Sequence, residues 1–283
     1  MACCVIKMAC SCIDDYDIEM KKLAFLLIAV AAPASAWAAD TMPQAQLGIE
    51  GYHESYHETV DGASFMTEKA RMLGLTMALR EDVNDKGDSF LLRGRYAWGS
   101  ADYSSASGQY SGLNRKNFDF SLVYQHAFAL SATTLTPEFG IGYRRLDDHL
   151  EQSGWGGYAR NSMYSYLLFG ISSRNNINAD WMVSPRLAYK YMLAGSQESQ
   201  LGNISSSCSN LSNRQKNGYG YEANLAFDRK LESGNYLTLA PYYRYWHIKD
   251  SDTATAVCGN WVIYGMEPHN TTTEVGMNLS YSF

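Results

Sequence analysis

From residue 46 onward, hydrophobic and polar residues alternate with a period of two along successive segments of the chain. This period is typical of β-strands, in which successive side chains point to opposite faces, whereas a helix would show a period near 3.6 residues. The alternation is plainest in residues 183–193 and 274–283. No segment after Ala38 has a convincing helical period, so we predict an all-β chain.

The pattern predicts ten strands, two of which are less regular than the others. Residues 46–57 lose the alternation near Gly51, where we expect a β-bulge. In residues 163–171 either face could be the apolar one. We expect the connections, which are alternately long and short, at residues 58–69, 81–88, 99–115, 128–134, 146–162, 172–180, 194–217, 228–235 and 249–270.

This alternation of long and short connections indicates the architecture. A soluble β-sandwich has no reason to show it, whereas a bacterial outer-membrane barrel has long extracellular loops, short periplasmic turns and an even number of strands. Because lipid cannot satisfy backbone N–H and C=O groups, a sheet that crosses a membrane must close on itself. We therefore predict a transmembrane, antiparallel, up-and-down β-barrel of ten strands in the cell outer membrane, with both termini of the chain in the periplasm.

The face opposite the apolar rows should line the barrel, and it carries six basic and five acidic residues. An eight-stranded barrel is filled by its side chains and a 16–18-stranded porin is open, so ten strands lie nearer the filled end. An unpaired buried charge is costly, so we expect a salt-bridge network that plugs the bore. The alternative is the selectivity lining of a narrow pore. These residues are Glu50, Arg93, Arg95, Asp119, Glu138, Arg144, Arg186, Lys190, Glu222, Arg244 and Glu274.

Residues 20–38 have the anatomy of a secretory signal peptide: a basic start, an apolar run, and an A-x-A cleavage site ending at Ala38. The apolar run is shorter than the roughly 20 residues that a transmembrane helix needs. Cleavage after Ala38 would leave residues 39–283 as the barrel. Residues 1–19 match no targeting pattern, and we interpret them as an over-extended gene start.

Cysteine usage and charge agree with an exported membrane protein. Four of the six cysteines precede the predicted signal peptide, and only Cys208 and Cys258 remain in the barrel. They fall in the fourth and fifth outer loops, where we expect a disulfide. Only 18% of the residues are charged, against about 25% in soluble proteins. The net charge of −6 argues against a nucleic-acid partner, which would need a basic patch.

The chain ends in an alternating strand that closes with Tyr281 and Phe283. A C-terminal Phe in such a strand resembles the assembly signal of outer-membrane barrels. We therefore expect the outer-membrane assembly machinery, outer-membrane lipid and lipopolysaccharide as partners, and no cofactor or metal.

Two short motifs suggest chemistry. The segment from His53 to His57 matches H-E-x-x-H, in which a helix brings two zinc ligands onto one face. On a strand those histidines would lie about 13 Å apart, too far to share one zinc ion. The second motif, Asp147-Asp148-His149, lies at the outer end of a strand, where a histidine oriented by a carboxylate could activate water.

Omptin proteases are ten-stranded barrels that pair Asp-x-His with two aspartates on the facing wall. Here the second outer loop offers only Asp102. We therefore expect no catalytic residues and no enzymatic activity, and keep an outer-rim, omptin-like hydrolase as a remote alternative.

Six segments carry a resemblance to a known group: residues 65–68, 94–104, 140–148, 157–162, 243–252 and 267–276. They resemble a family of uncharacterised outer-membrane β-barrel proteins of Gram-negative bacteria. The resemblance implies the barrel fold and no established activity, so no catalytic residue is carried over. It also suggests a carboxylate–arginine network at the rim, involving Tyr158, Arg160, Asp250 and Asp252.

The predicted function is a surface or structural role through the extracellular loops, with an unknown extracellular ligand and a plugged bore. The alternative is a narrow, porin-like channel for small solutes.

Overall fold

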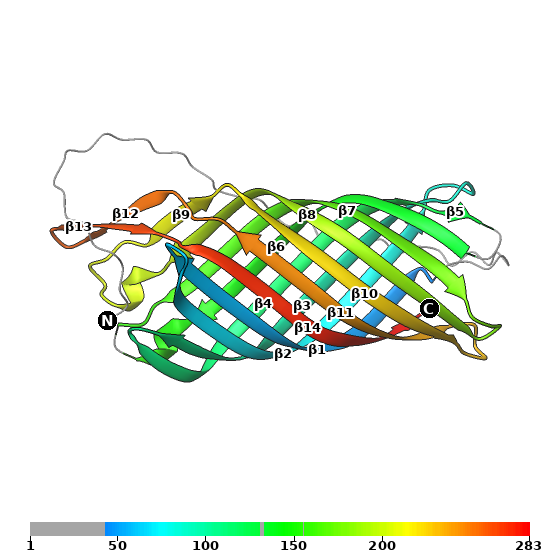
Figure 1. Ribbon diagram of the computed structural model, residues 1–283, viewed down its shortest axis with the longest axis horizontal. Coiled ribbons are helices and arrows are strands. Elements are labelled where there is room, and N and C mark those ends of the chain that lie inside the picture. Colours follow the sequence, from blue (N-terminus) through cyan, green and yellow to red (C-terminus); the bar gives the residue numbers. More distant parts are fainter. Residues whose placement is uncertain (1–42, 131–132, 155) are drawn as a thin grey trace.

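The computed structural model describes residues 43–130, 133–154 and 156–283, and ten long antiparallel strands close into one barrel (Figure 1). Each strand pairs with the next, and β14 pairs with β1, which closes the ring. The predicted ten-stranded up-and-down barrel is confirmed. Its strands are β1 (Ala45–Val60), β2 (Ala63–Asp82), β3 (Asp88–Ser105), β4 (Gly108–His126), β6 (Thr133–His149), β7 (Ala159–Asn176), β8 (Trp181–Ser199), β10 (Gly218–Lys230), β11 (Tyr236–Ile248) and β14 (His269–Ser282).

The two faces of the barrel wall differ sharply in polarity. Outward-facing residues of the middle of the strands are apolar and exposed; Leu75, Ile141 and Leu187 have 54%, 56% and 61% of their surface accessible. A water-soluble protein rarely exposes so continuous an apolar surface. This belt therefore suits lipid, while the inward-facing positions are buried and rich in charged residues. No helix in the described ranges is long and apolar enough to cross a membrane.

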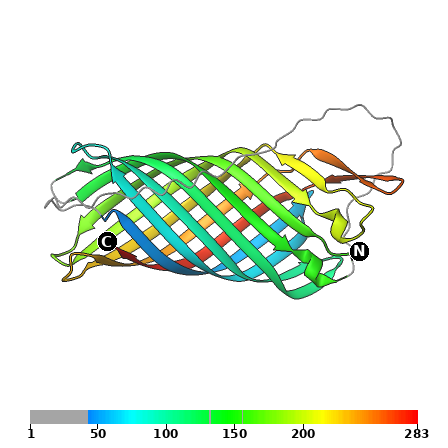
Figure 2. The ribbon, with the colours of Figure 1, turned by 180° about the vertical axis from the view of Figure 1, so that it is seen from behind.

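The two ends of the barrel have different connections, and Figure 2 shows them from behind. At the turn end, where β1 begins and β14 ends, Ala45 and Phe283 pair through their backbones. This end also carries the short β5 (Phe128–Ala129). The opposite end, called the loop end below, carries the remaining short elements. These are η1 (Leu150–Ser153), η2 (Leu201–Asn203), β9 (Leu211–Gln215), β12 (Thr253–Cys258) and β13 (Trp261–Met266).

The prediction of long loops is wrong for two of the connections at the loop end. Residues 58–69 and 99–115 continue as paired strands well beyond the apolar belt and end in turns of two residues, at 61–62 and 106–107. Asp61 and Gly62 have φ values of 50° and 78°, as a tight hairpin turn of this Asp-Gly type requires. The apolar row stops at the edge of the belt, but the inward-facing row continues, so strand pairing continues too.

The prediction of a β-bulge near Gly51 is also wrong, because β1 pairs with β2 without a break from Ala45 to Glu58. The register shifts only between Glu58 and Thr59. Gly51 faces outward in phase with the preceding apolar residues, and Tyr52 on the other face is buried inside the barrel. An inward aromatic residue, and not a bulge, produced the apparent loss of alternation.

The ambiguity in residues 163–171 has a similar cause. Tyr164, Tyr166 and Leu168 point inward and are buried, while Phe169 and Ile171 point outward and are exposed. Both faces of this part of β7 are apolar because the two inward tyrosines pack against Trp246 of β11 inside the barrel, with ring centroids 6.2 and 5.4 Å apart. The predicted leader, residues 1–38, lies outside the described residues.

Candidate functional site: the charged barrel interior

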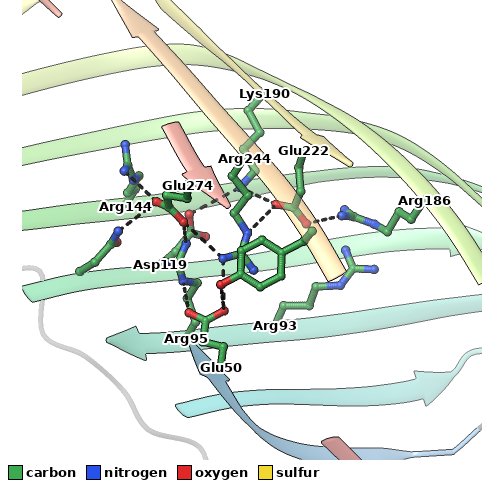
Figure 3. A network of polar contacts seen from close by, with 12 residues as sticks. Glu50, Arg93, Arg95, Asp119, Arg144, Arg186, Lys190, Glu222, Arg244 and Glu274 are labelled. Atoms are coloured by element: carbon green, nitrogen blue, oxygen red, sulfur yellow. Dashed lines mark hydrogen bonds and ion pairs between the residues drawn. The ribbon is translucent and has the colours of Figure 1, made fainter. Parts of the chain in front are cut away.

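Charged side chains from eight strands meet inside the barrel (Figure 3). The structure places all eleven of the expected interior residues on the inward face, each with at least one ion pair. We call this group the central cluster. It consists of Glu50, Arg93, Arg95, Asp119, Glu138, Arg144, Arg186, Lys190, Glu222, Arg244 and Glu274.

Glu274 of β14 is the acceptor at which one half of the central cluster converges. Arg95 Nη1 lies 2.8 Å from its carboxylate, Arg144 Nη2 lies 3.1 Å away and Arg244 Nη1 lies 3.3 Å away. Glu50 of β1 accepts from Arg95 at 2.9 Å and from Arg244 at 3.2 Å. Arg95 and Arg144 come from β3 and β6 and reach Glu274 across the bore, whereas Arg244 lies directly opposite Glu274 on the neighbouring strand β11.

Glu138 of β6 organises the half of the cluster nearer the turn end. Arg93 forms two hydrogen bonds to it, at 3.0 and 3.1 Å, and Arg186 adds a third at 2.9 Å. Arg186 also reaches Glu222 at 2.6 Å, and Lys190 lies 3.1 Å from the same carboxylate. Two-pronged guanidinium–carboxylate pairs are the strongest of these contacts, so this half is rigidly connected.

A second group of charges, which we call the outer cluster, fills the bore nearer the loop end. Arg115 of β4 contacts Glu54, Glu68 and Asp148. Arg160 of β7 lies 2.6 Å from Glu58, 3.3 Å from Asp148 and 3.7 Å from Glu267. All members are buried. The outer cluster consists of Glu54, Glu58, Glu68, Arg115, Asp148, Arg160 and Glu267.

The outer cluster was not expected from the sequence, because most of its members fall in segments predicted to be loops. Glu58, Glu68, Arg115 and Asp148 instead lie on the strand extensions. A usable pattern was present: Glu50, Tyr52, Glu54, Tyr56 and Glu58 occupy alternate positions of one strand face. Following the inward parity beyond the apolar row would have found them.

The outer cluster contains two basic and five acidic residues, and Glu267 shows the consequence. This residue lies in the connection between β13 and β14, beyond the lipid-facing belt. Burial raises the pKa of the Glu267 carboxyl well above its usual range, and neighbouring Glu58 raises it further. Tyr56 donates a hydrogen bond to Glu58 at 2.8 Å and lies 3.3 Å from Glu267, so the tyrosine hydroxyl bridges the two carboxyl groups.

Aromatic rings fill the space between the charges. The guanidinium of Arg244 lies 3.9 Å from the ring centre of Tyr242, that of Arg95 lies 5.0 Å from Tyr52, and that of Arg144 lies 5.2 Å from Trp246. Such cation–π contacts stabilise a desolvated cation, by about 2 kcal/mol in favourable cases. They explain why aromatic residues occur on the inward face as well as in the belt.

A cavity of about 370 Å³ lies in the part of the bore between the central cluster and the turn end. Arg93, Arg186, Lys190 and Glu222 contribute to its lining. The side chain of Arg93 keeps 28% of its surface accessible, whereas Glu138 beneath it keeps 1%. The central cluster therefore forms the floor of this cavity.

The motif from His53 to His57 does not form a metal site. Both histidines lie on the outward face of β1, and Glu54 points inward to Arg115. His57 is within hydrogen-bonding distance of Ser64 Oγ, at 3.0 Å. Across the described ranges, no group of three or more His, Cys, Asp or Glu residues has the geometry to hold a metal ion.

The residues of the second motif point in different directions. Asp147 pairs with Arg145 at 2.7 Å, and Asp148 belongs to the outer cluster. His149 Nδ1 lies 2.7 Å from Glu151 at the start of η1, so a carboxylate does contact this histidine, though not the one within the motif. Asp102, which faces outward on β3, is exposed.

At the rim, Arg160 does bind carboxylates, but neither Asp250 nor Asp252 is among its partners. These two aspartates accept backbone N–H groups, from His269 at 2.6 Å and from Arg214 at 2.7 Å. Cys208 and Cys258 form a disulfide that joins the β8–β10 and β11–β14 connections. Tyr281 and Phe283 lie on the outward face at the turn end and are exposed.

The similarity of this chain to known proteins lies in its fold. No protein-family model and no curated protein sequence matches the chain. Among solved structures, the outer membrane protease OmpT of Escherichia coli superposes with a TM-score of 0.58 at 9% identity, covering 84% of this chain and 96% of OmpT. The chain has the fold of an outer-membrane β-barrel.

Two further barrels are similar at lower scores. The transport unit of the autotransporter AIDA-I from Escherichia coli has a TM-score of 0.47 at 11% identity, covering 88% of this chain and 93% of that unit. Neisserial surface protein A has a TM-score of 0.35 at 9% identity, covering 85% and 97%. At such identities the likeness concerns architecture, and the protease activity of OmpT is not carried over to this barrel.

Proposed function

We propose that this barrel is a surface protein of the outer membrane, with its loop end outside the cell, and that charged side chains close its bore. The observation that carries the proposal is a pair of contacts across the full width of the barrel. Arg144 and Glu274 lie five strands apart in the ten-stranded ring, as do Arg160 and Glu58, and both pairs are in contact. Two successive clusters with such cross-bore pairs leave little room for a hydrated solute.

The loop end supports the surface role, because it is a structured platform. The Cys208–Cys258 disulfide and a small apolar core of Leu201, Leu211 and Ala256 hold two connections together. The tip of the β12–β13 hairpin exposes Trp261 and Val262, with 66% and 52% of their surfaces accessible. Exposed apolar residues on an ordered hairpin are typical of a contact surface for a partner.

Single-channel recording in a planar bilayer tests the closed bore. Refolded residues 39–283 should insert as a heat-modifiable barrel and give no discrete conductance steps. Stable steps from the folded wild-type barrel would contradict the proposal.

The surface role needs its own test. Cells that display a variant with residues 259–262 replaced by Gly-Asn-Gly-Ser should adsorb less well to host cells or phage than cells that display the wild type. Equal adsorption at equal surface abundance would argue against a role for the hairpin.

A narrow channel is the second candidate, and the turn-end cavity favours it. Under this alternative, Arg93 and Arg186 would act as selectivity residues, so R93Q and R186Q would change conductance or ion preference. An outer-rim hydrolase would instead require turnover that H149A abolishes.

A further inference from the structure

The outer surface of the barrel carries basic residues where the lipid-facing belt ends toward the loop end. Arg71 on β2, Lys116 on β4 and Arg145 on β6 each occupy the next outward-facing position after the last residue of the continuous apolar row on their own strand. Those last apolar residues are Leu73, Phe118 and Tyr143.

The strand register shows that the three basic residues follow the edge of the belt. Leu73 pairs with Trp98 on β3, Trp98 pairs with Lys116, and Phe118 pairs with Arg145. The last residue of the apolar row therefore lies two residues closer to the turn end on β4 than on β3, and two residues closer again on β6. Barrel strands are tilted by about 35–45°, so a line parallel to the membrane must move along the strands in this way. We call this group, with Trp98 at its centre, the edge patch.

Among the ten described strands of the barrel, Lys and Arg occupy this position on β2, β4 and β6 only. The corresponding position holds Gly51 on β1, Ser100 on β3, Asn161 on β7, Gly195 on β8, His247 on β11 and Thr273 on β14, and β10 begins beside its last apolar residue, Tyr219. A general need for solubility at the membrane edge would spread Lys and Arg around the whole circumference. Their restriction to the β2–β6 side indicates a ligand that binds there.

Two of the cations are available for a ligand. Arg145 pairs with Asp147 at 2.7 Å. Arg71 and Lys116 are exposed, and within the described ranges neither forms an ion pair. Trp98, between them on β3, has 40% of its surface accessible, and tryptophan favours the headgroup level of a membrane.

We infer that the edge patch binds the headgroup phosphates of the lipid in the leaflet at the loop end. With that end outside the cell, as the proposed function requires, the ligand is the phosphorylated lipid A part of lipopolysaccharide. Arg71 and Lys116 donate charge-assisted hydrogen bonds to the phosphates, and the acyl chains lie against Leu73 and Phe118. The ligand is a lipid and not free phosphate, because the site adjoins the apolar belt directly.

The test compares matched double variants of the full barrel in detergent, using native mass spectrometry to count bound lipid. The probes are diphosphorylated lipid A and the same lipid without phosphates. The variant R71Q/K116Q removes two exposed cations from the edge patch. The control R214Q/K249Q removes two exposed cations, also at the loop end, from the β9 and β11 side. Each basic residue near an anionic surface contributes about fivefold, so R71Q/K116Q should bind phosphorylated lipid A about 30-fold more weakly.

Wild type and control should prefer the phosphorylated lipid, and R71Q/K116Q should lose that preference while keeping the heat-modifiable band of a folded barrel. Equal losses in both variants, or no preference in the wild type, would overturn the inference. Displacement of the lipid by millimolar inorganic phosphate would also overturn it, because the site would then be one for free anions. Conductance is a separate readout: an open bore with intact lipid preference would refute the closed bore and leave the edge patch standing.

Discussion

Arg144 and Glu274 project from strands on diametrically opposite sides of the barrel and meet at a distance of 3.1 Å inside it. Both side chains have only 1% of their surface accessible. This contact ties the wall formed by β6 to the wall formed by β14, which share no backbone hydrogen bonds. The barrel is therefore held together across its interior as well as around its circumference.

Breaking this contact from one side should destabilise the barrel. R144M removes one of three cations that surround Glu274, and loss of one partner from a buried ion pair typically costs about 3–5 kcal/mol. We expect the free energy of unfolding to fall by somewhat less than this, because Arg95 and Arg244 still contact the carboxylate. Urea unfolding of the barrel in lipid vesicles measures this change. R80M, at the turn end and paired with Asp82, is the control, and an equal loss there would contradict a special role for Arg144.

Removing the cross-bore contacts should open the barrel. In the quadruple variant R144S/E274S/R160S/E58S, both long side chains of each opposite-strand pair are replaced by small polar ones. We expect discrete conductance steps in a planar bilayer, with none from the wild type. The variant R80S/D82S loses a pair from the turn end and should stay silent. A folded quadruple variant without conductance would mean that other side chains close the bore.

The loop end should loosen as the pH rises. The folded protein holds the pKa of Glu267 above its unfolded value, so folding favours the protonated carboxyl. The stabilisation is fully present below the ordinary glutamate pKa and is lost as the pH rises through the raised one. Backbone contacts between Ser251 and Glu267 hold the β11–β14 connection, so its amide exchange should increase over this interval. E267Q should abolish the dependence, while E232Q in a turn should leave it unchanged.

The disulfide should stabilise the loop end without being needed for the barrel. Cys208 and Cys258 are 50 residues apart, and a bond closing a segment of this size contributes about 2–4 kcal/mol. The double variant C208S/C258S should keep the heat-modifiable band shift of a folded barrel and become more sensitive to proteolysis in residues 201–211 and 249–268. Unchanged proteolysis would show that the core of Leu201, Leu211 and Ala256 suffices.

The alternation along a single strand shows which of its residues face lipid and which face the bore, without knowledge of the adjacent strands. This is because each strand of a membrane barrel contacts lipid on one face and the bore on the other. Rows such as Val275 to Phe283 therefore predicted the strand count, the closed barrel and the inward position of residues such as Arg95 and Glu222. The prediction of the strand ends was wrong where the outward-facing residues become polar. Glu68 and Arg115 were assigned to loops although their strands continue.

By itself, the sequence determined the architecture and which residues within the apolar belt face the bore, since both follow from a local period of two. Only the tertiary structure decided which charges meet. The partners Arg144 and Glu274 are 130 residues apart in the chain, and their contact depends on barrel closure, strand register and the reach of a side chain across the bore. The same holds for the edge patch, because the stagger of neighbouring strands, and not any spacing within one strand, aligns Arg71, Lys116 and Arg145 along the belt.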